Sequence, residues 1–156
     1  MRLTIAAVGR ARDGPEAALV ADYLERATRT GRPLGLGPVA LREVEDRKGG
    51  GMEGEARLLR AALPDDARLI ALDERGKALT SPAFAETLAR WRDDGIRDTG
   101  FLIGGADGLA PTLRATATLT LSLGPMVWPH LLARAMLAEQ LYRATTILAG
   151  GPYHRG

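Results

Sequence analysis

The chain has 156 residues, about the length of one domain and enough to bury a core. Charged residues make up 26% of it and nearly balance, at a formal net charge of +2, so charge alone does not indicate a strongly acidic partner. With no cysteine and only two histidines, disulfides, thiolate metal sites and His-rich metal clusters are excluded, and we expect no metal.

Runs typical of strands alternate along the chain with runs of helical periodicity, which predicts an α/β domain with a mostly parallel sheet flanked by helices. The predicted strands cover residues 3–8, 39–44, 68–73, 99–103 and 119–123. The predicted helices cover residues 15–28, 55–63, 81–93, 111–116 and 129–148. We therefore expect a single domain over residues 1–156.

Two connections are rich in charge. Residues 45–54 combine charged side chains with glycines and are predicted to form a mobile loop, and residues 74–77 are predicted to form a turn. The apolar run near the amino terminus lacks the pattern of a cleaved signal and is interpreted as a buried strand. No apolar run approaches the roughly 20 residues that a membrane span needs, so we expect a soluble, cytoplasmic protein.

A Gly-rich turn, Ile103 to Gly108, follows the fourth predicted strand. Glycine permits positive φ and lets a ligand approach bare N–H groups. The turn has neither the glycine spacing of the dinucleotide fingerprint nor the Gly-Lys-Ser/Thr ending of a Walker loop. An anion or cofactor site and a plain strand-to-helix turn both fit this pattern.

The connection from Leu123 to Pro129 is almost wholly apolar, although Trp128 stands where solvent would normally reach. An adenine ring held among Leu72, Leu123, Met126 and Trp128 would cover it, and this lining is typical of a cofactor pocket. Packing into the core or against a second copy would cover it equally well. The spacing does not choose between these interpretations.

The last predicted helix is apolar over more than one face, which indicates core packing with a subunit interface as its extension. Tyr142 and Arg143 are expected to be ordinary residues at the edge of that apolar surface. Beyond the helix, Tyr153, His154 and Arg155 have side chains that stack on a base, exchange a proton and pair with a phosphate. A frayed terminus is the alternative.

Five motifs together carry a family resemblance. They are Leu72-Asp73-Glu74-Arg75-Gly76-Lys77, Ile103-Gly104-Gly105 with Gly108, Trp128-Pro129-His130, Ala138-Glu139-Gln140-Leu141-Tyr142-Arg143-Ala144, and Pro152-Tyr153-His154-Arg155. In order and spacing the whole chain resembles the RlmH-type ribosomal RNA large subunit methyltransferases of the SPOUT superfamily. The resemblance implies methyl transfer from S-adenosylmethionine to N3 of a pseudouridine in helix 69 of 23S rRNA, on assembled ribosomes.

The resemblance also implies a homodimer whose carboxyl end threads a trefoil knot, which fold-level rules alone would not predict. It places the cofactor among three loops. The cofactor-binding residues it implies are Leu72, Gly104, Leu123, Gly124, Pro125, Met126, Val127 and Trp128. The tail would approach the active site across or beside the dimer interface, so dimerisation would be needed for activity.

Three positions depart from the pattern: Val127 stands where the family usually has Thr, Pro125 where it has a polar or basic residue, and Leu131 where it often has Gln. A missing hydroxyl removes one hydrogen bond, about 0.5 to 1.5 kcal/mol net. This change bears on cofactor affinity more than on the type of reaction.

Four residues are the candidate catalytic groups. His130 or His154 could take the N3 proton, Arg155 could stabilise the resulting negative charge, and Tyr153 could stack on the base. The residues do not decide which group is the proton acceptor. Two alternatives from other functional classes remain. One is a non-catalytic RNA-binding module that uses the basic carboxyl end, and the other is a nucleotide hydrolase built on the glycine turn.

Overall fold

Five parallel strands form one sheet in the computed structural model, which describes residues 1–156. The strands are β1 (Arg2–Val8), β2 (Val39–Val44), β3 (Arg68–Ala78), β4 (Asp98–Ile103) and β5 (Leu119–Ser122). Their order across the sheet is β2-β1-β4-β3-β5, and every pairing is parallel. The predicted α/β architecture with a parallel sheet is therefore confirmed.

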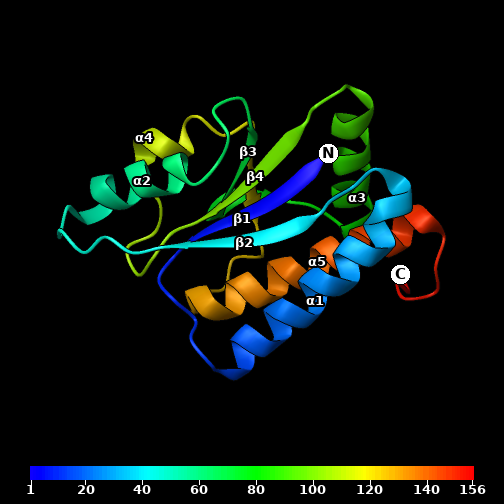
Figure 1. Cartoon of the computed structure of the whole chain (residues 1–156), viewed down its shortest axis with the longest axis horizontal. Coiled ribbons are helices and arrows are strands. Elements are labelled where there is room, and N and C mark those ends of the chain that lie inside the picture. The colour runs from blue at the N-terminus through cyan, green and yellow to red at the C-terminus, as the bar shows by residue number, and fades with distance from the viewer.

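Helices cover both faces of the sheet (Figure 1). The α-helices are α1 (Pro15–Gly31), α2 (Gly51–Ala61), α3 (Ser81–Asp93), α4 (Pro111–Arg114) and α5 (His130–Ala149), and a 3-10 turn, η1 (Arg32–Leu34), follows α1. One face packs against α1, α3 and α5, and the other against α2 and α4. No helix combines the length and apolar content that crossing a membrane requires.

The central strands are apolar on both sides because both faces of the sheet are covered. In β1, Ile5 belongs to the core under α1 and α5, whereas its neighbour Ala6 belongs to the core under α2. Phe101 and Leu102 of β4 divide in the same way. Because both faces are buried, the sequences of these central strands are short continuous apolar runs and do not alternate between apolar and polar residues.

The predicted loop over residues 45–54 is wrong in its second part. Helix α2 begins at Gly51, four residues before the predicted start, despite glycines at positions 51 and 54. Ala56 and Leu59 are buried against the sheet, and Met52 packs beside them. Tertiary packing of this apolar face outweighs the low helix propensity of glycine, a local penalty of about 1 kcal/mol per residue.

The predicted turn over residues 74–77 is also wrong, because β3 continues to Ala78. Lys77 and Ala78 pair with Leu121 and Ser122 of β5, after a register shift that begins at Leu72. The pairing supplies backbone partners that a sequence pattern does not reveal. The shift displaces residues 73–76 from the regular ladder, between the buried first half of β3 and its exposed last residues, and irregularities of this kind often lie beside functional sites.

Candidate functional site

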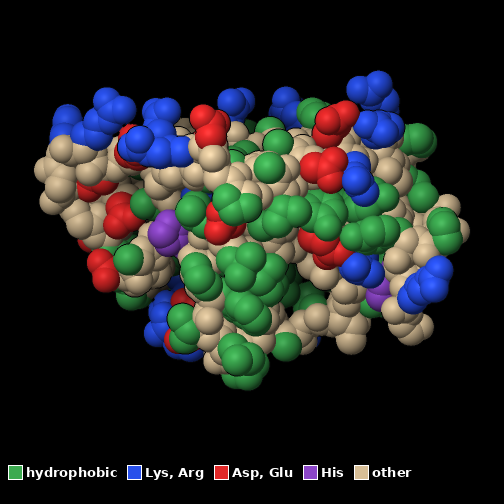
Figure 2. All heavy atoms as spheres, turned by 90° about the horizontal axis from the view of Figure 1, so that it is seen from below, with side chains coloured by type: hydrophobic (Ala, Val, Ile, Leu, Met, Phe, Trp, Pro, Cys, Tyr) green, Lys and Arg blue, Asp and Glu red, His purple; other side chains and the backbone are tan.

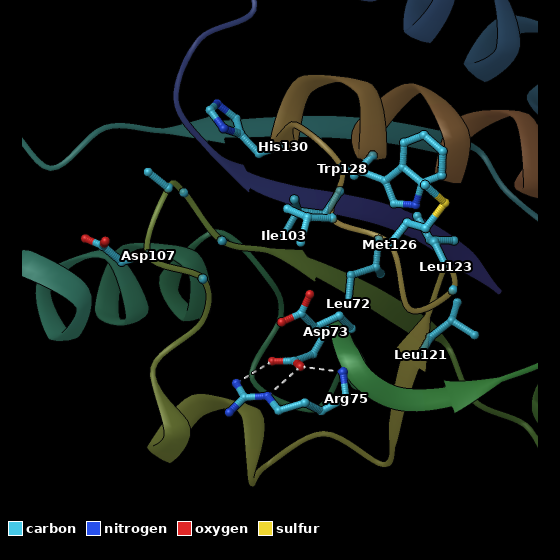
Figure 3. A pocket seen from close by; sticks show the side chains of 18 residues that line it. Leu72, Asp73, Arg75, Ile103, Asp107, Leu121, Leu123, Met126, Trp128 and His130 are labelled. Atoms are coloured by element: carbon cyan, nitrogen blue, oxygen red, sulfur yellow. Dashed lines mark hydrogen bonds and ion pairs between the residues drawn. The ribbon is translucent and has the colours of Figure 1, made fainter.

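A cavity of about 310 Å³ opens at the carboxyl ends of β4 and β5, beside the irregular stretch of β3 that begins after Leu72. These strands are neighbours in the sheet, and open α/β sheets bind ligands at this edge. Three segments line the cavity: residues 72–75, residues 103–108, and a set drawn from residues 121–133 (Figure 3). Three segments that are separate in sequence therefore meet in one place.

Most of the residues proposed to bind a cofactor lie around this cavity. They are Leu72, Gly104, Leu123, Gly124, Met126, Val127 and Trp128, joined by the proposed catalytic residue His130. Pro125 is exposed and is not among the lining residues. In Figure 3 the side chains of Leu72, Leu123, Met126 and Trp128 gather on one side of the cavity.

The turn after β4 needs glycine for packing reasons. A Cβ on Gly104 would lie 2.4 Å from the carbonyl carbon of Gly108, so no side chain fits there. Gly108 donates its N–H to the carbonyl of Gly105 at 3.0 Å and has φ of +79°, the left-handed region that favours glycine. The turn thus folds tightly on itself where it lines the cavity.

The apolar connection after β5 is the exposed wall of the site. Met126 is 69% exposed, Val127 is 82% exposed and Trp128 is 38% exposed. Gly124, with φ of +110°, redirects the chain at the start of this connection, and Ser122 accepts a hydrogen bond from its N–H at 3.1 Å. Three large apolar side chains in water indicate that this wall meets a ligand or another protein surface.

A carboxylate that the sequence reasoning missed lies at one side of the cavity. Asp73 accepts hydrogen bonds from Nε and Nη2 of Arg75, each at 2.9 Å (Figure 3). It also accepts one from Nη1 of Arg114 at 3.0 Å. These hydrogen bonds hold the pKa of the Asp73 carboxyl well below its ordinary value, the contacts with Arg75 being the main cause. The only sequence signal was the run of charged residues after a buried strand.

His130 is the first residue of α5 and is fixed next to the end of β1. A Cβ built on Gly9 would lie 3.8 Å from its Nε2 atom. One turn later, the fully buried Arg134 donates to the carbonyls of Val8 and Gly9, at 3.1 and 3.2 Å. The amino end of α5, and His130 with it, is thereby anchored to the edge of the sheet that carries the cavity.

The three tail candidates lie elsewhere. Tyr153, His154 and Arg155 follow the carboxyl end of α5, a helix of 20 residues that spans about 30 Å. Figure 2 shows the two histidine side chains, the only ones in the chain, at opposite ends of the molecular face that it presents. The fold therefore brings His130 together with the cavity and keeps the tail of the same chain away from it.

The tail is not a frayed terminus. The hydroxyl of Tyr153 donates to Oε1 of Glu139 at 3.0 Å, and an Nη1 hydrogen of Arg143 faces Nδ1 of His154 at 3.2 Å. Arg143, expected to be an ordinary edge residue, instead contacts two tail side chains. Sequence reasoning missed Glu139 as well, although it is the only acidic residue after Asp107.

Comparisons with known proteins agree with this arrangement. A family model described as "Predicted SPOUT methyltransferase" matches residues 1–154. Proteins named ribosomal RNA large subunit methyltransferase H are 68% identical in Cereibacter sphaeroides (strain ATCC 17025) and 63% identical in Paracoccus denitrificans, each over 155 residues and 99% of both chains. A solved probable methylase family protein from Haemophilus influenzae shares the fold, with a TM-score of 0.55 at 14% identity, over 99% of this chain and 70% of that one.

Proposed function

The chain belongs to the SPOUT methyltransferase family, and on that premise we propose that it transfers a methyl group from S-adenosylmethionine to ribosomal RNA of the large subunit. The proposed target is N3 of a pseudouridine in helix 69 of 23S rRNA, within assembled ribosomes. Relatives more than 60% identical over 99% of both chains, all named for this class of methyltransferase, support the reaction class. The cavity lined by the matched cofactor segments is the observation that carries the proposal.

The residues around the cavity fit the proposed cofactor. Leu72, Leu123 and Trp128 supply apolar walls for an adenine ring, and the turn from Gly104 to Gly108 adds backbone to the lining. The cavity volume of about 310 Å³ lies at the lower end of the range for small-molecule sites. When bound, S-adenosylmethionine supplies an electrophilic methyl group on a sulfonium. The exposed carboxylates Glu74 and Asp107 on the rim offer negative charge to the cationic part of such a ligand.

The position of the tail supports a homodimer. Tyr153, His154 and Arg155 lie past the end of α5, whereas the cavity lies at its start, so a tail that serves the reaction enters the site of a second copy. The exposed apolar wall, Met126 to Trp128, offers a surface for that copy. In this proposal each active site combines the cavity and His130 of one protomer with the tail of its partner. A trefoil knot at the carboxyl end is part of the same proposal.

Methylation at N3 exchanges one bond to nitrogen for another. Held among Leu72, Leu123 and Trp128, S-adenosylmethionine would supply the methyl group, and its sulfur would keep the electron pair of the broken carbon–sulfur bond. The base would lose its N3 proton and gain the methyl group at N3. The chain's own groups must orient the base in line with the methyl, accept the proton and stabilise negative charge on the imide. His130 beside the cavity and His154 in the tail are the candidate proton acceptors, Arg155 is the candidate cation, and Tyr153 is the candidate stacking group.

The proposal is tested with labelled S-adenosylmethionine and assembled ribosomes that lack the modification, followed by mass spectrometry of the digested helix 69 fragment. We expect one new methyl on pseudouridine. Binding of the cofactor without transfer would assign a different RNA target. Absence of both binding and transfer would overturn the enzymatic proposal and favour a non-catalytic RNA-binding module.

A further inference from the structure

The tail of the chain is held by a hydrogen-bonded cluster on α5 that the proposed reaction does not by itself require. Glu139 and Arg143 stand four residues apart on one face of the helix, and both are mostly buried, with 18% and 23% of their side chains exposed. Arg143 donates through Nε and Nη2 to Oε1 of Glu139. The tail folds back onto this pair at the red end of the chain (Figure 1).

Glu139 is saturated with donors. Its Oε1 atom accepts from Tyr153 and Arg143, and its Oε2 atom accepts from Nε2 of Gln140 at 3.0 Å. The amide oxygen of Gln140 in turn accepts from the hydroxyl of Ser81, at the start of α3, at 2.7 Å. The carboxylate is therefore fixed by neighbours on two helices. The Glu139 carboxylate therefore holds neighbouring side chains in place and is not positioned to exchange a proton with the substrate.

Tyr153 is held on three sides. Its hydroxyl donates to Glu139, its ring centroid lies 4.6 Å from that of Tyr142, and Cζ of Arg143 lies 4.7 Å from its ring centre. Burial, followed by hydrogen bonding to its neighbours, raises the pKa of the Tyr153 phenol. The phenol consequently stays protonated and donates to Glu139 across the physiological range of pH.

His154 is constrained by Arg143. Nη1 of Arg143 lies 3.2 Å from Nδ1 of the imidazole. A guanidinium has donors only, so Nδ1 must act as the acceptor in this contact. The hydrogen of the neutral ring is then on Nε2, because a neutral imidazole carries one N–H and the partner of one nitrogen decides the role of the other.

We propose that the Glu139–Arg143 pair is a positioning device that fixes His154 as the Nε2–H tautomer, so that the tail offers the substrate base a hydrogen-bond donor and not a proton acceptor. Glu139 and Arg143 act through the tail and do not touch the base. The inference rests on the proposed function only in naming that base. The tautomer itself follows from the contact between two side chains of this chain.

The donor has a definite use in the proposed reaction. N3 of a pseudouridine lies between two carbonyl groups, and as its proton leaves, negative charge spreads onto both carbonyl oxygens. An N–H aimed at one of these oxygens stabilises that charge, as donors at an oxyanion do in general. The proton then passes to His130, the remaining imidazole of the site, and the N3–H electron pair forms the new bond to the methyl carbon.

The first test is the tautomer. Since the chain has only two histidines, the variant His130→Gln leaves one imidazole, and nitrogen-15 NMR of that protein at alkaline pH reports its two nitrogens separately. We expect one protonated Nε2 and one unprotonated Nδ1, with no averaging. Adding Arg143→Met should produce the averaged signals of a free imidazole. Adding Arg26→Met, which removes a guanidinium lying 5.8 Å over the ring of Tyr142, is the matched control and should change nothing at His154.

The second test is catalytic. In otherwise wild-type protein, Arg143→Met and Glu139→Gln should each lower kcat of methyl transfer by about 100-fold, the order found when a donor to developing charge is removed, with cofactor affinity unchanged. Arg143→Lys, which keeps a donor for Nδ1, should restore part of the rate. If Arg143 had only a structural role, the Arg143→Lys substitution would not raise kcat above that of Arg143→Met. Averaged imidazole signals with Arg143 present, or full kcat in Arg143→Met, would overturn the inference.

The two tests also separate this inference from the proposed function. If the wild-type protein transfers no methyl group to ribosomes, the proposed function fails, while the NMR experiment still decides whether Arg143 selects the tautomer. If transfer occurs but His154 exchanges between both tautomers with Arg143 in place, the positioning device is rejected and the methyltransferase proposal stands.

Discussion

Arg134 and Glu43 form an ion pair that joins the start of α5 to the end of β2, with 2.7 Å between Nη1 and Oε2. Arg134 is fully buried, and Glu43 also accepts the N–H of Ala11 from the loop after β1. Three segments distant in sequence meet in this cluster, one turn of helix away from His130. The pair therefore fixes the position of a proposed catalytic residue as well as the packing of α5 on the sheet.

Replacing Glu43 by Gln should lower the free energy of unfolding by about 3 kcal/mol, because the buried guanidinium loses its counter-charge. The measurement is urea denaturation followed by circular dichroism. Glu45→Gln is the matched control: Glu45 pairs with the exposed Arg10, and we expect a change of at most about 1 kcal/mol. Equal effects of the two substitutions would contradict the assignment of Arg134 as a buried charge that depends on Glu43.

Substituting Gly104 by Ala should weaken cofactor binding and reduce stability by about 1 to 3 kcal/mol, because the new methyl group would overlap the backbone at Gly108. Isothermal titration with S-adenosylmethionine and thermal denaturation measure the two effects. Ala61→Ser, at an exposed position at the end of α2 and outside the cavity, should leave both nearly unchanged. Unaltered binding in Gly104→Ala would show that the turn does not contact the cofactor.

Fluorescence should report cofactor binding through a single tryptophan. Trp128 lines the cavity and is 38% exposed, whereas Trp91 is 6% exposed in the core under α3. Addition of S-adenosylmethionine should therefore change the emission of the wild-type protein. In Trp128→Phe that change should disappear, and in Trp91→Phe it should persist. A response that depends on Trp91 would place the ligand away from the cavity.

Removal of the tail after Gly151 should abolish methyl transfer while cofactor affinity stays within about twofold. The reason is geometric: Tyr153, His154 and Arg155 lie at the opposite end of α5 from the cavity of their own chain, so in the proposed homodimer they would serve the cavity of the second copy. Mixing the truncated chain with Gly104→Ala subunits provides a complementation test. Mixed dimers that contain one intact cavity and one intact tail from different chains should regain activity, and failure of mixing to restore any would argue against a shared site.

The ion pairs of Asp73 predict how stability depends on acid. A carboxyl whose folded-state pKa is depressed contributes stability above its unfolded pKa of about 3.9 and loses that contribution as the pH falls toward the folded value. The stability gap between the wild-type protein and Asp73→Asn should thus be constant from pH 7 to about 5 and shrink below about 4. Denaturant midpoints across this range measure it. Asp107→Asn, which removes an exposed carboxylate without an ion-pair partner, is the control. A gap that did not narrow in acid would contradict the role of Arg75.

Local sequence determined the elements and the segments that supply the site. The strands and four of the five α-helices start within two residues of their predicted positions, because apolar spacing, prolines at helix starts and glycines at stops are properties of short stretches. The family resemblance implied a ligand among Leu72, Gly104 and Trp128, and these residues do line one cavity. Gly104 follows the end of β4 and Trp128 lies in the connection after β5, and parallel strands bring such ends to a common edge.

Tertiary structure decided what depends on partners distant in sequence. Helix α2 starts at Gly51 because its apolar face packs on the sheet, and β3 runs on to Ala78 because β5 offers it hydrogen bonds. Arginine is usually exposed because its side chain is charged. Arg134 is nevertheless buried, because Glu43 and two backbone carbonyls accept its hydrogen bonds. Likewise, only the folded chain shows that Arg143 holds His154, because that contact requires the tail to turn back along α5 and no pattern of neighbouring residues encodes such a turn.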